Sequence, residues 1–366
     1  MWGTTRTARR GYQGRRRRPQ GYRPRVLPNR ACLAPAEVNA RIIWRVATRV
    51  AALARLGAPG ARPRAAAIDW TTPIDRSRRF YCETLSPLFY TPSYARLSEP
   101  QRRRHTQLMG MLSNELIARL EADVVDRCLA AVERTGDLPP DLADAVAGFR
   151  ADERRHAEAW HRLNALSEPA WYGRAARSTL LGVPPLAGQL APILARQPWA
   201  IAAILWIQLL QEERSIDISR RLLRMPAEAI EPRYAAVYRE HLRDEVRHVQ
   251  LDARLIAHVH ARQTPAARRW TAACLRWVVD RFFLRPARSA DRLLAILAAE
   301  FPELGPMVPT MRRELRAVAG DDRFHAMMYS RSSTPTSFGL FDAHPEFHVM
   351  RRVLRAYTPP GQGSPA

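Results

Sequence analysis

The chain has 366 residues, of which 46% are hydrophobic, so it can form one large domain or two ordinary ones with a substantial core. It carries 58 arginines and no lysine against 35 acidic residues, which gives a net charge of +23. This composition excludes a membrane-spanning protein, a coiled coil and a disulfide scaffold, and the four widely spaced cysteines predict free thiols in a reducing, cytoplasmic compartment.

The N-terminal residues 1–66 are predicted to form a disordered arm. They are rich in Arg, Gly and Pro, and residues 1–67 contain 16 arginines but a single acid, Glu37. A solvated tail, or residues upstream of the true start codon, accounts for this charge better than a surface for nucleic acid or an anionic membrane, because the other 299 residues carry only +8. Neither nucleic acid nor a membrane is therefore expected as a partner.

Four long helices predict an all-α protein. They are expected at residues 98–134, 140–166, 199–225 and 232–262, separated by breaks that contain Pro or Gly. Helices of about 25–35 residues exceed the usual length and predict a four-helix bundle. Shorter helices are expected at about 265–284, 289–300, 306–318 and 344–356. Residues 67–330 are thus predicted to form one domain, and residues 331–366 a C-terminal extension.

One pentapeptide pattern occurs in both the second and the fourth of these helices. The sequences DERRH (152–156) and DEVRH (244–248) share the form Asp-Glu-x-Arg-His and lie 92 residues apart. Helix geometry places residues i and i+3 on one face, so each Glu and His can bind one ion together. The repeat therefore predicts four metal ligands: Glu153, His156, Glu245 and His248.

A bundle site of this type needs one more carboxylate from each of the other two helices. Glu121 and Glu212 begin the similar sequences EADVVD and EERSID, and their separation of 91 residues matches that of the DExRH pair. Both share a helix face with apolar residues, whereas Glu115 and Glu213 share theirs with arginines and are expected to face solvent. We therefore predict Glu121 and Glu212 as ligands, with Glu213 left as an alternative to Glu212.

Three further residues lie close to the predicted ligands. His241 precedes Glu245 by four residues, which places it on the same helix face, and a role as a third imidazole ligand is favoured over that of a core histidine. Asp152 and Asp244 are placed to accept a hydrogen bond from the ligand histidines across the helix pair.

The alternative to a metal site is a network of ion pairs between these residues and neighbouring arginines. Four carboxylates that converge in an apolar bundle would repel one another unless cations neutralised them, so a metal site is favoured. Mixed imidazole and carboxylate ligands indicate iron or manganese and argue against calcium and magnesium.

The duplicated ExxH pattern, with one Glu from each of two other helices, resembles the ferritin-like di-iron carboxylate proteins. The additional His241, in the sequence His-x3-Glu-x2-His, is similar to the p-aminobenzoate N-oxygenase (AurF-type) family. The similarity extends from about Ile68 through the fourth helix, and in weaker form to about residue 330. It implies a ferritin-like four-helix bundle with additional C-terminal helices, and two Fe ions, with Mn as the alternative. The ligands it implies are Glu121, Glu153, His156, Glu212, His241, Glu245 and His248.

The same resemblance implies a reaction and its partners. In that family the site activates O2 and oxidises an arylamine through the hydroxylamine to a nitroso or nitro compound, here expected in secondary metabolism. The expected partners are therefore a small-molecule amine, O2 and a reductase that donates electrons. A homodimer is a possible assembly.

Two other functions are compatible with a ferritin-like metal site. A di-iron hydroxylase or desaturase acting on carbon would have nearly the same fold and ligands, and only His241 argues against it. A ferritin-like iron-binding protein without an organic substrate is disfavoured, because such a bundle does not need the long addition after residue 262.

Overall fold

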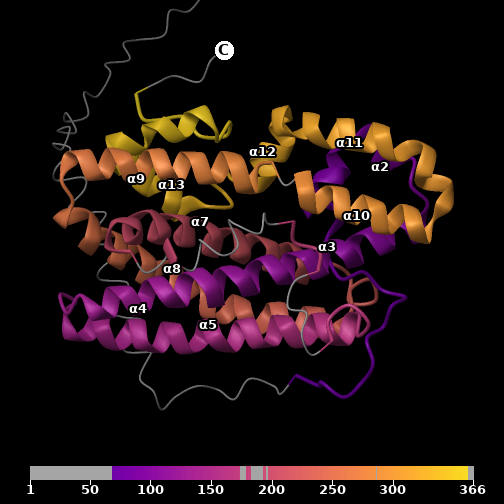
Figure 1. Cartoon of the computed structure of the whole chain (residues 1–366), viewed down its shortest axis with the longest axis horizontal. Coiled ribbons are helices and arrows are strands. Elements are labelled where there is room, and N and C mark those ends of the chain that lie inside the picture. Colours follow the sequence, from indigo (N-terminus) through magenta and orange to yellow (C-terminus); the bar gives the residue numbers. More distant parts are fainter. Residues whose placement is uncertain (1–67, 174–178, 183–192, 195–196, 286, 362–366) are drawn as a thin grey trace, which may run out of the picture. The chain divides into compact units, whose positions relative to one another are not determined.

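The computed structural model describes residues 68–173, 179–182, 193–194, 197–285 and 287–361 (Figure 1). The predicted arm, residues 1–66, lies outside these described residues. No β-strand occurs among them, and one isolated bridge joins Arg79 to Ile230. The predicted all-α class is therefore confirmed.

The core of the fold is a bundle of four long helical segments. The first is continuous through a π-helical turn, and the bounds of all four lie within two residues of those expected from the sequence. The segments are α3 (Glu99–Arg119) with η3 (Leu120–Val125) and α4 (Asp126–Arg134), then α5 (Pro140–Ser167), α7 (Pro198–Leu223) and α8 (Pro232–Arg262).

Local signals explain where these helices begin. Ser98 and Gln101 form a capping box at the start of α3. Proline occupies the first position of α5, α7 and α8, where its fixed φ suits the helix and no backbone N–H is needed. Between α4 and α5, Gly136 adopts a φ of 70°, a left-handed conformation that glycine adopts without steric cost.

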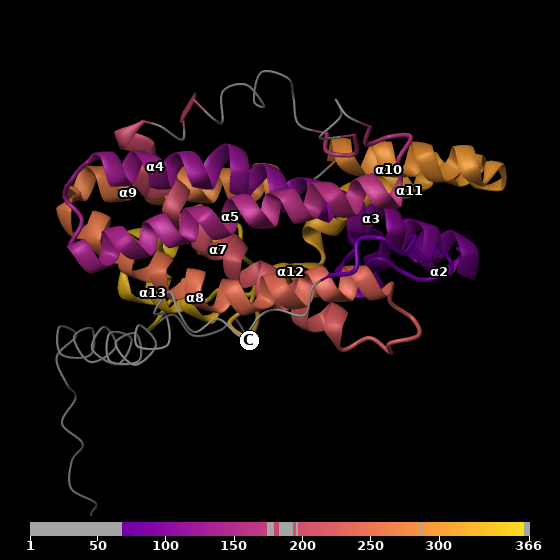
Figure 2. The ribbon, with the colours of Figure 1, turned by 90° about the horizontal axis from the view of Figure 1, so that it is seen from below.

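The bundle pairs helices that are neighbours in sequence. The segment from α3 to α4 runs beside α5, α7 runs beside α8, and these pairs meet where α5 contacts α8 and α4 contacts α7 (Figures 1 and 2). Leu129, Val146, Leu205 and Leu255 are fully buried between them. Burial of each such side chain contributes about 1.5–3 kcal/mol, so packing of the apolar faces holds the helices together. This arrangement is the expected ferritin-like bundle.

The C-terminal elements cover two parts of this bundle. The helix α9 (Pro265–Val278) and α13 (Pro335–Ala343) pack on α7, and η7 (Pro345–Arg352) packs on α9 (Figure 1). The helix α10 (Ala287–Glu300) instead contacts α3, and α11 (Val308–Ala317) contacts α10. The sequence did not predict α12 (Asp322–Met328) or α13, which are too short to show a clear helical period.

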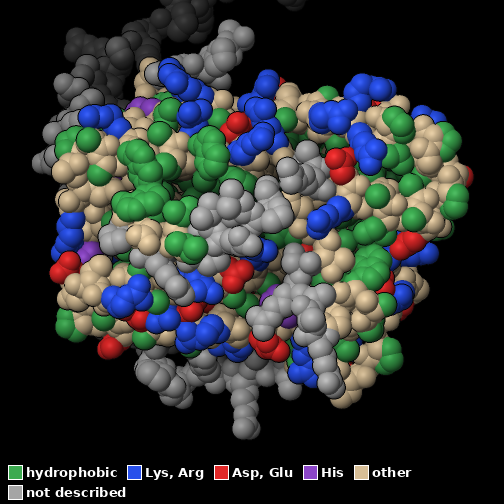
Figure 3. All heavy atoms as spheres, in the orientation of Figure 1, with side chains coloured by type: hydrophobic (Ala, Val, Ile, Leu, Met, Phe, Trp, Pro, Cys, Tyr) green, Lys and Arg blue, Asp and Glu red, His purple; other side chains and the backbone are tan. Residues whose placement is uncertain are grey.

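The surface charge and the helix hydropathy of the described residues agree with what the sequence composition predicts. Figure 3 shows arginine side chains spread over the visible face with carboxylates between them, as the small excess charge of residues 68–366 leads one to expect. Among the described helices, none combines the length and the apolar character that crossing a lipid bilayer requires.

Candidate metal centre

The structure brings six of the seven predicted ligands together inside the bundle. They come from η3, α5 and α8, and each is at most 6% exposed. The ligand atoms form two groups, within each of which they lie no more than 4.8 Å apart. One group is Glu121, His156, His241 and Glu245, and the other is Glu153, His156, Glu245 and His248. Because His156 and Glu245 belong to both groups, the arrangement suits two adjacent cations.

Glu245 lies at the centre of the cluster and faces three imidazoles. Its Oε1 is 2.8 Å from His241 Nε2, 3.4 Å from His248 Nδ1 and 3.5 Å from His156 Nδ1. Glu153 Oε1 lies 3.3 Å from the same Nδ1 of His248. The inward atoms of this cluster are therefore the Nδ1 atoms of two histidines, the Nε2 atom of the third, and carboxylate oxygens.

The two aspartates of the DExRH sequences lie on the outer side of the histidines, each on the opposite helix. Asp244 Oδ2 is 3.0 Å from His156 Nε2, and Asp152 Oδ2 is 3.5 Å from His248 Nε2. Although burial opposes ionisation, contacts with His248 and Arg155 lower the pKa of Asp152 to about 2. Asp244 hydrogen-bonds the outer nitrogen of His156 and so fixes that ring, whereas the contact of Asp152 with His248 is longer and leaves Nε2 of His248 without a hydrogen-bond partner.

The shared arginine of the DExRH pattern has a role that the sequence did not reveal. Arg155 donates to Asp152 at 2.7 Å and to Asp244 at 2.6 Å, and Arg247 contacts the same two aspartates. Each arginine thus ties together the two aspartates that hold the ligand histidines. The sequence does contain a sign of this role, because the arginine occupies the same position in both copies of the pattern.

The donor atoms of the cluster fit a metal better than a closed hydrogen-bond network. Both oxygens of Glu153 and of Glu245, one oxygen of Glu121, and Nδ1 of His156 and His248 are buried without a hydrogen-bond partner. A buried polar atom left unpaired costs about 1–3 kcal/mol. Burial raises the pKa of Glu121 to about 8, a second sign that its charge lacks compensation. Divalent cations would supply that compensation, and nitrogen with oxygen donors suits iron or manganese.

His241 is held in an orientation that suits a ligand. Its Nε2 lies 3.0 Å from Glu121 Oε1 and 2.8 Å from Glu245 Oε1, while its Nδ1 lies 3.2 Å from the hydroxyl of Ser215 on α7. Burial lowers the pKa of His241 well below its usual value, so the imidazole is neutral and has a lone pair to donate. This geometry supports the prediction made from its position in the sequence.

Glu212 is the one predicted ligand that falls in neither group. It is buried on α7, and no described hydrogen bond or ion pair joins it to the six clustered residues. The adjacent Glu213 has a different partner, because its carboxylate accepts hydrogen bonds from the backbone N–H groups of Thr336 at 2.6 Å and Ser337 at 2.8 Å, at the start of α13. That contact favours Glu212 over Glu213, and Glu212 stays a prediction.

Glu115 and Glu213 were expected to face solvent, and this expectation is wrong. They are 2% and 3% exposed. Glu115 accepts hydrogen bonds from the backbone N–H groups of Thr179, Leu180 and Leu181 at 2.6 to 2.8 Å. Helix periodicity could not reveal that residues 179–181 and α13 cover these faces.

A further buried carboxyl, Asp252, was missed in the sequence. It is fully buried on α8, one turn after His248, and neither oxygen has a hydrogen-bond partner among the described residues. Burial raises the pKa of Asp252 well above the usual value, because the charged carboxylate is desolvated. Its spacing of four residues from His248 and seven from Glu245 places it on the ligand face, which was the available signal.

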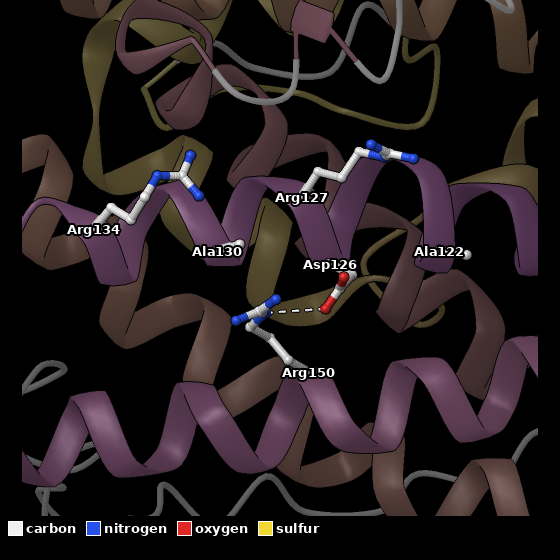
Figure 4. A pocket seen from close by; sticks show the side chains of 6 residues that line it. All are labelled: Ala122, Asp126, Arg127, Ala130, Arg134 and Arg150. Carbon is white, nitrogen blue, oxygen red and sulfur yellow. Dashed lines mark hydrogen bonds and ion pairs between the residues drawn. The ribbon is translucent and has the colours of Figure 1, made fainter.

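A separate cavity of about 320 Å³ lies between α4 and α5, and none of the clustered ligands lines it (Figure 4). Asp126 crosses it to bind Arg150 at 3.0 Å. The other residues around it are Ala122, Arg127, Ala130 and Arg134. This cavity is therefore distinct from the metal centre.

Replacement of single carboxylates by alanine tests which of the neighbouring glutamates bind the metal. Glu121→Ala and Glu212→Ala are each expected to lower the metal content, because each removes a predicted ligand. Glu115→Ala and Glu213→Ala are expected to keep the metal and to lower the melting temperature, because backbone N–H groups lose their acceptor. Elemental analysis normalised to folded protein measures the first effect. Metal retained in Glu121→Ala but lost in Glu115→Ala would show that the wrong carboxylate of this helix is assigned as the ligand.

The pKa values of the cluster predict that metal binding releases protons. Burial alone would lower the pKa of His248, but the neighbouring Glu245 and Asp152 raise it to about 9. In the metal-free chain, the charged imidazole therefore adds stability that is complete below about pH 6.5 and is lost as pH rises through about 9. A metal ion must displace this proton, so metal affinity should increase from pH 6 towards pH 9.

Calorimetric titration with Fe²⁺ or Mn²⁺ under anaerobic conditions, in two buffers of different ionisation enthalpy, counts the protons released. Release at pH 7 that decreases above pH 9 is expected. Affinity that does not change with pH would contradict the assignment of His248 as a ligand.

Comparison with known proteins places most of this chain in one family. Residues 47–296, more than two thirds of the chain, match the family model described as P-aminobenzoate N-oxygenase AurF. The matched range contains all seven predicted ligands. It begins about 20 residues before the expected limit at Ile68, so residues 47–66 belong to the match and the expected limit is wrong. A search of curated proteins gave no match.

Proposed function

This chain belongs to the p-aminobenzoate N-oxygenase (AurF) family of oxygenases, and we propose that it is an O2-dependent di-iron enzyme that N-oxygenates an arylamine. The product would be a hydroxylamine, nitroso or nitro compound of secondary metabolism. The observation that carries this proposal is His241, because its imidazole contacts Glu121 and Glu245 inside a cluster of buried carboxylates.

Two iron ions, or two manganese ions as the alternative, are proposed to bind the seven predicted ligands, Glu212 included. When bound, the iron supplies the activation of O2. The protein's own part is to hold the ligands in place before the metal arrives. Asp244 hydrogen-bonds His156, Ser215 hydrogen-bonds His241, and Asp152 lies 3.5 Å from His248.

Apolar side chains around the cluster are proposed to keep bulk water from it. Val125, Leu205 and Leu209 are fully buried, and Ile216 is 9% exposed. Exclusion of water protects a reactive oxidant from side reactions. Asp252 lies one turn from His248 and burial raises its pKa, so it is proposed as a group that can take up or release a proton beside the site.

The decisive experiment follows oxygen from O2 into the product. Iron-loaded protein is mixed with a chemical reductant, isotopically labelled O2 and p-aminobenzoate or a panel of other arylamines, and the products are analysed by mass spectrometry. The expected product carries label on the amine nitrogen. Label on a ring or side-chain carbon would favour the carbon hydroxylase, and uptake of iron and O2 without any organic product would favour an iron-binding protein.

The remaining parts of the proposal concern partners and location. A reductase is proposed to deliver electrons, and the protein is proposed to act in the cytoplasm. A homodimer is the assembly to test, by light scattering of the iron-loaded chain.

Removal of the N-terminal arm tests the proposed division of the chain. A protein that begins at Ala47, where the family match starts, is expected to keep its helical content, iron and activity and to lose any salt-sensitive binding to DNA. A second protein that begins at Ala67 shows whether residues 47–66 are needed. Loss of folded protein on removal of residues 1–46 would contradict the proposed arm.

A further inference from the structure

A second group of metal-binding side chains lies outside the predicted di-iron centre. His260 near the end of α8, His344 after α13, and Glu346 in η7 each offer one donor atom, and these atoms lie within 4.8 Å of one another. None of the three is among the predicted iron ligands. His344 and Glu346 also lie beyond residue 296, where the match to the family model ends.

The contact between His260 and Glu346 is close but is not a hydrogen bond. His260 is 4% exposed, and its Nε2 lies 3.0 Å from Glu346 Oε1. Nevertheless both ring nitrogens of His260 and this oxygen of Glu346 lack a hydrogen-bond partner. The ring of His344 lies beside them, with its centroid 4.2 Å from that of His260. The three side chains therefore bring one donor atom each to a single place, within 4.8 Å of one another.

The charges in this group leave Glu346 without a compensating cation from the two imidazoles. Burial lowers the pKa of His260 to about 4 and also lowers the pKa of His344, so both rings are neutral at pH 7. Arg268 lies nearby, but its Nε donates to the backbone carbonyl of His260 at 3.1 Å. A divalent cation bound to both this carboxylate oxygen and the neutral ring nitrogen would supply the missing positive charge.

We propose that His260, His344 and Glu346 bind one divalent transition-metal ion. Two imidazole nitrogens and one carboxylate oxygen are a donor set of zinc sites, in which water takes the fourth position. Metal–ligand distances of about 2.0–2.1 Å in a tetrahedral site separate the donor atoms by roughly 3.3 Å, close to the spacing of His260 and Glu346. Calcium and magnesium prefer oxygen donors alone, so they do not fit.

The ion would join the end of α8 to the junction of α13 and η7. The helix α8 carries three of the predicted iron ligands. The first turn of α13 donates backbone hydrogen bonds to the carboxylate of Glu213. Trp206 closes one side of the new site, since its ring stacks on Phe347 at a centroid distance of 3.9 Å and lies 6.0 Å from the ring of His344. The role we infer is structural: the ion fastens the C-terminal segment to the bundle.

Cobalt titration of the full, iron-loaded chain tests this site. Co²⁺ in a nitrogen and oxygen site of low coordination number gives visible absorption, and Zn²⁺ should displace it. We expect one Co²⁺ per chain beyond the iron, with no iron released. The affinity should fall by more than roughly 100-fold in His344→Ala and in Glu346→Gln, because loss of even an outer partner of a ligand costs about 10- to 100-fold.

His258→Ala is the matched control, because His258 lies two residues from His260 on α8 and is not part of the group. It should bind Co²⁺ as the wild type does. Circular dichroism checks that each variant is folded, and Zn²⁺ should raise the melting temperature of the wild type and of His258→Ala only. Equal Co²⁺ binding by wild type and His344→Ala, or no Co²⁺ bound beyond the iron sites, would overturn the proposal.

Discussion

Glu245→Ala is expected to abolish binding of both proposed iron ions, and with it all O2-dependent oxidation. Glu245 belongs to both groups of ligand atoms, and its Oε1 faces all three ligand histidines. Its loss therefore removes a ligand from each ion at once. We expect iron affinity to fall by at least about 100-fold, since loss of even an outer partner of a ligand costs about 10- to 100-fold.

The melting temperature of the metal-free variant provides a second measurement that is independent of iron. Both oxygens of Glu245 are buried without hydrogen-bond partners, so alanine removes unpaired polar atoms from the core. Glu245 also raises the pKa of His248 in the metal-free chain, so metal-free Glu245→Ala should lose the part of the stability that depends on the charged imidazole and melt with a weaker dependence on pH than the metal-free wild type. Glu240→Ala is the control on the same helix, because Glu240 pairs with Arg243 away from the cluster. Normal iron content in Glu245→Ala would contradict the proposed centre.

His241→Ala is expected to have the second largest effect and to separate N-oxygenation from related reactions. The other predicted ligands still surround the ions, so the helical fold and part of the metal content should remain. Arylamine oxidation should fall by roughly 100-fold or more, because the imidazole that contacts Glu121 and Glu245 is lost. Iron content, rapid-mixing optical spectra after O2 exposure, and arylamine turnover are measured per folded molecule.

A graded variant shows whether the orientation of this histidine matters. Ser215→Ala keeps the imidazole but removes the hydroxyl 3.2 Å from its Nδ1, so its activity should lie between that of wild type and that of His241→Ala. If His241 is only a core residue, His241→Ala will lose stability yet keep wild-type iron content, spectra and turnover. That outcome would remove the main reason to prefer nitrogen over carbon as the site of oxidation.

The parts of the site that the sequence predicts well are those that repeat. The DExRH pattern identified Glu153, His156, Glu245 and His248, because a chemical pattern at the same place in two long helices rarely arises from composition alone. The helix period then brought in His241, and the structure places all five residues in one buried cluster. The bundle itself followed from long helices bounded by proline and glycine.

The features that the sequence could not predict depend on contacts between distant segments. Glu115 and Glu213 share helix faces with arginines, and only the folded chain shows that backbone amides of residues 179–181 and of α13 bind them. Asp252 was missed because a single carboxyl on a helix face has no pattern to mark it. The group around His260 was missed for a similar reason, since its three residues come from segments more than 80 residues apart.

The π-helical turn η3 was also unforeseen. It spans Leu120–Val125 and therefore includes Glu121 at the edge of the cluster. A π-turn inserts one extra residue in a helix, and such turns occur often at functional sites. Periodicity assumes a regular helix, so it placed Glu121 on the correct side but could not show the local widening.

The most direct test of the central claim is the iron content of the purified chain together with that of Glu245→Ala. His344→Ala serves as the parent protein, so that the proposed second site does not contribute metal. We expect two iron ions per chain in the parent protein and almost none after the additional Glu245→Ala change. One iron per chain, zinc in place of iron, or two irons retained without Glu245 would contradict it.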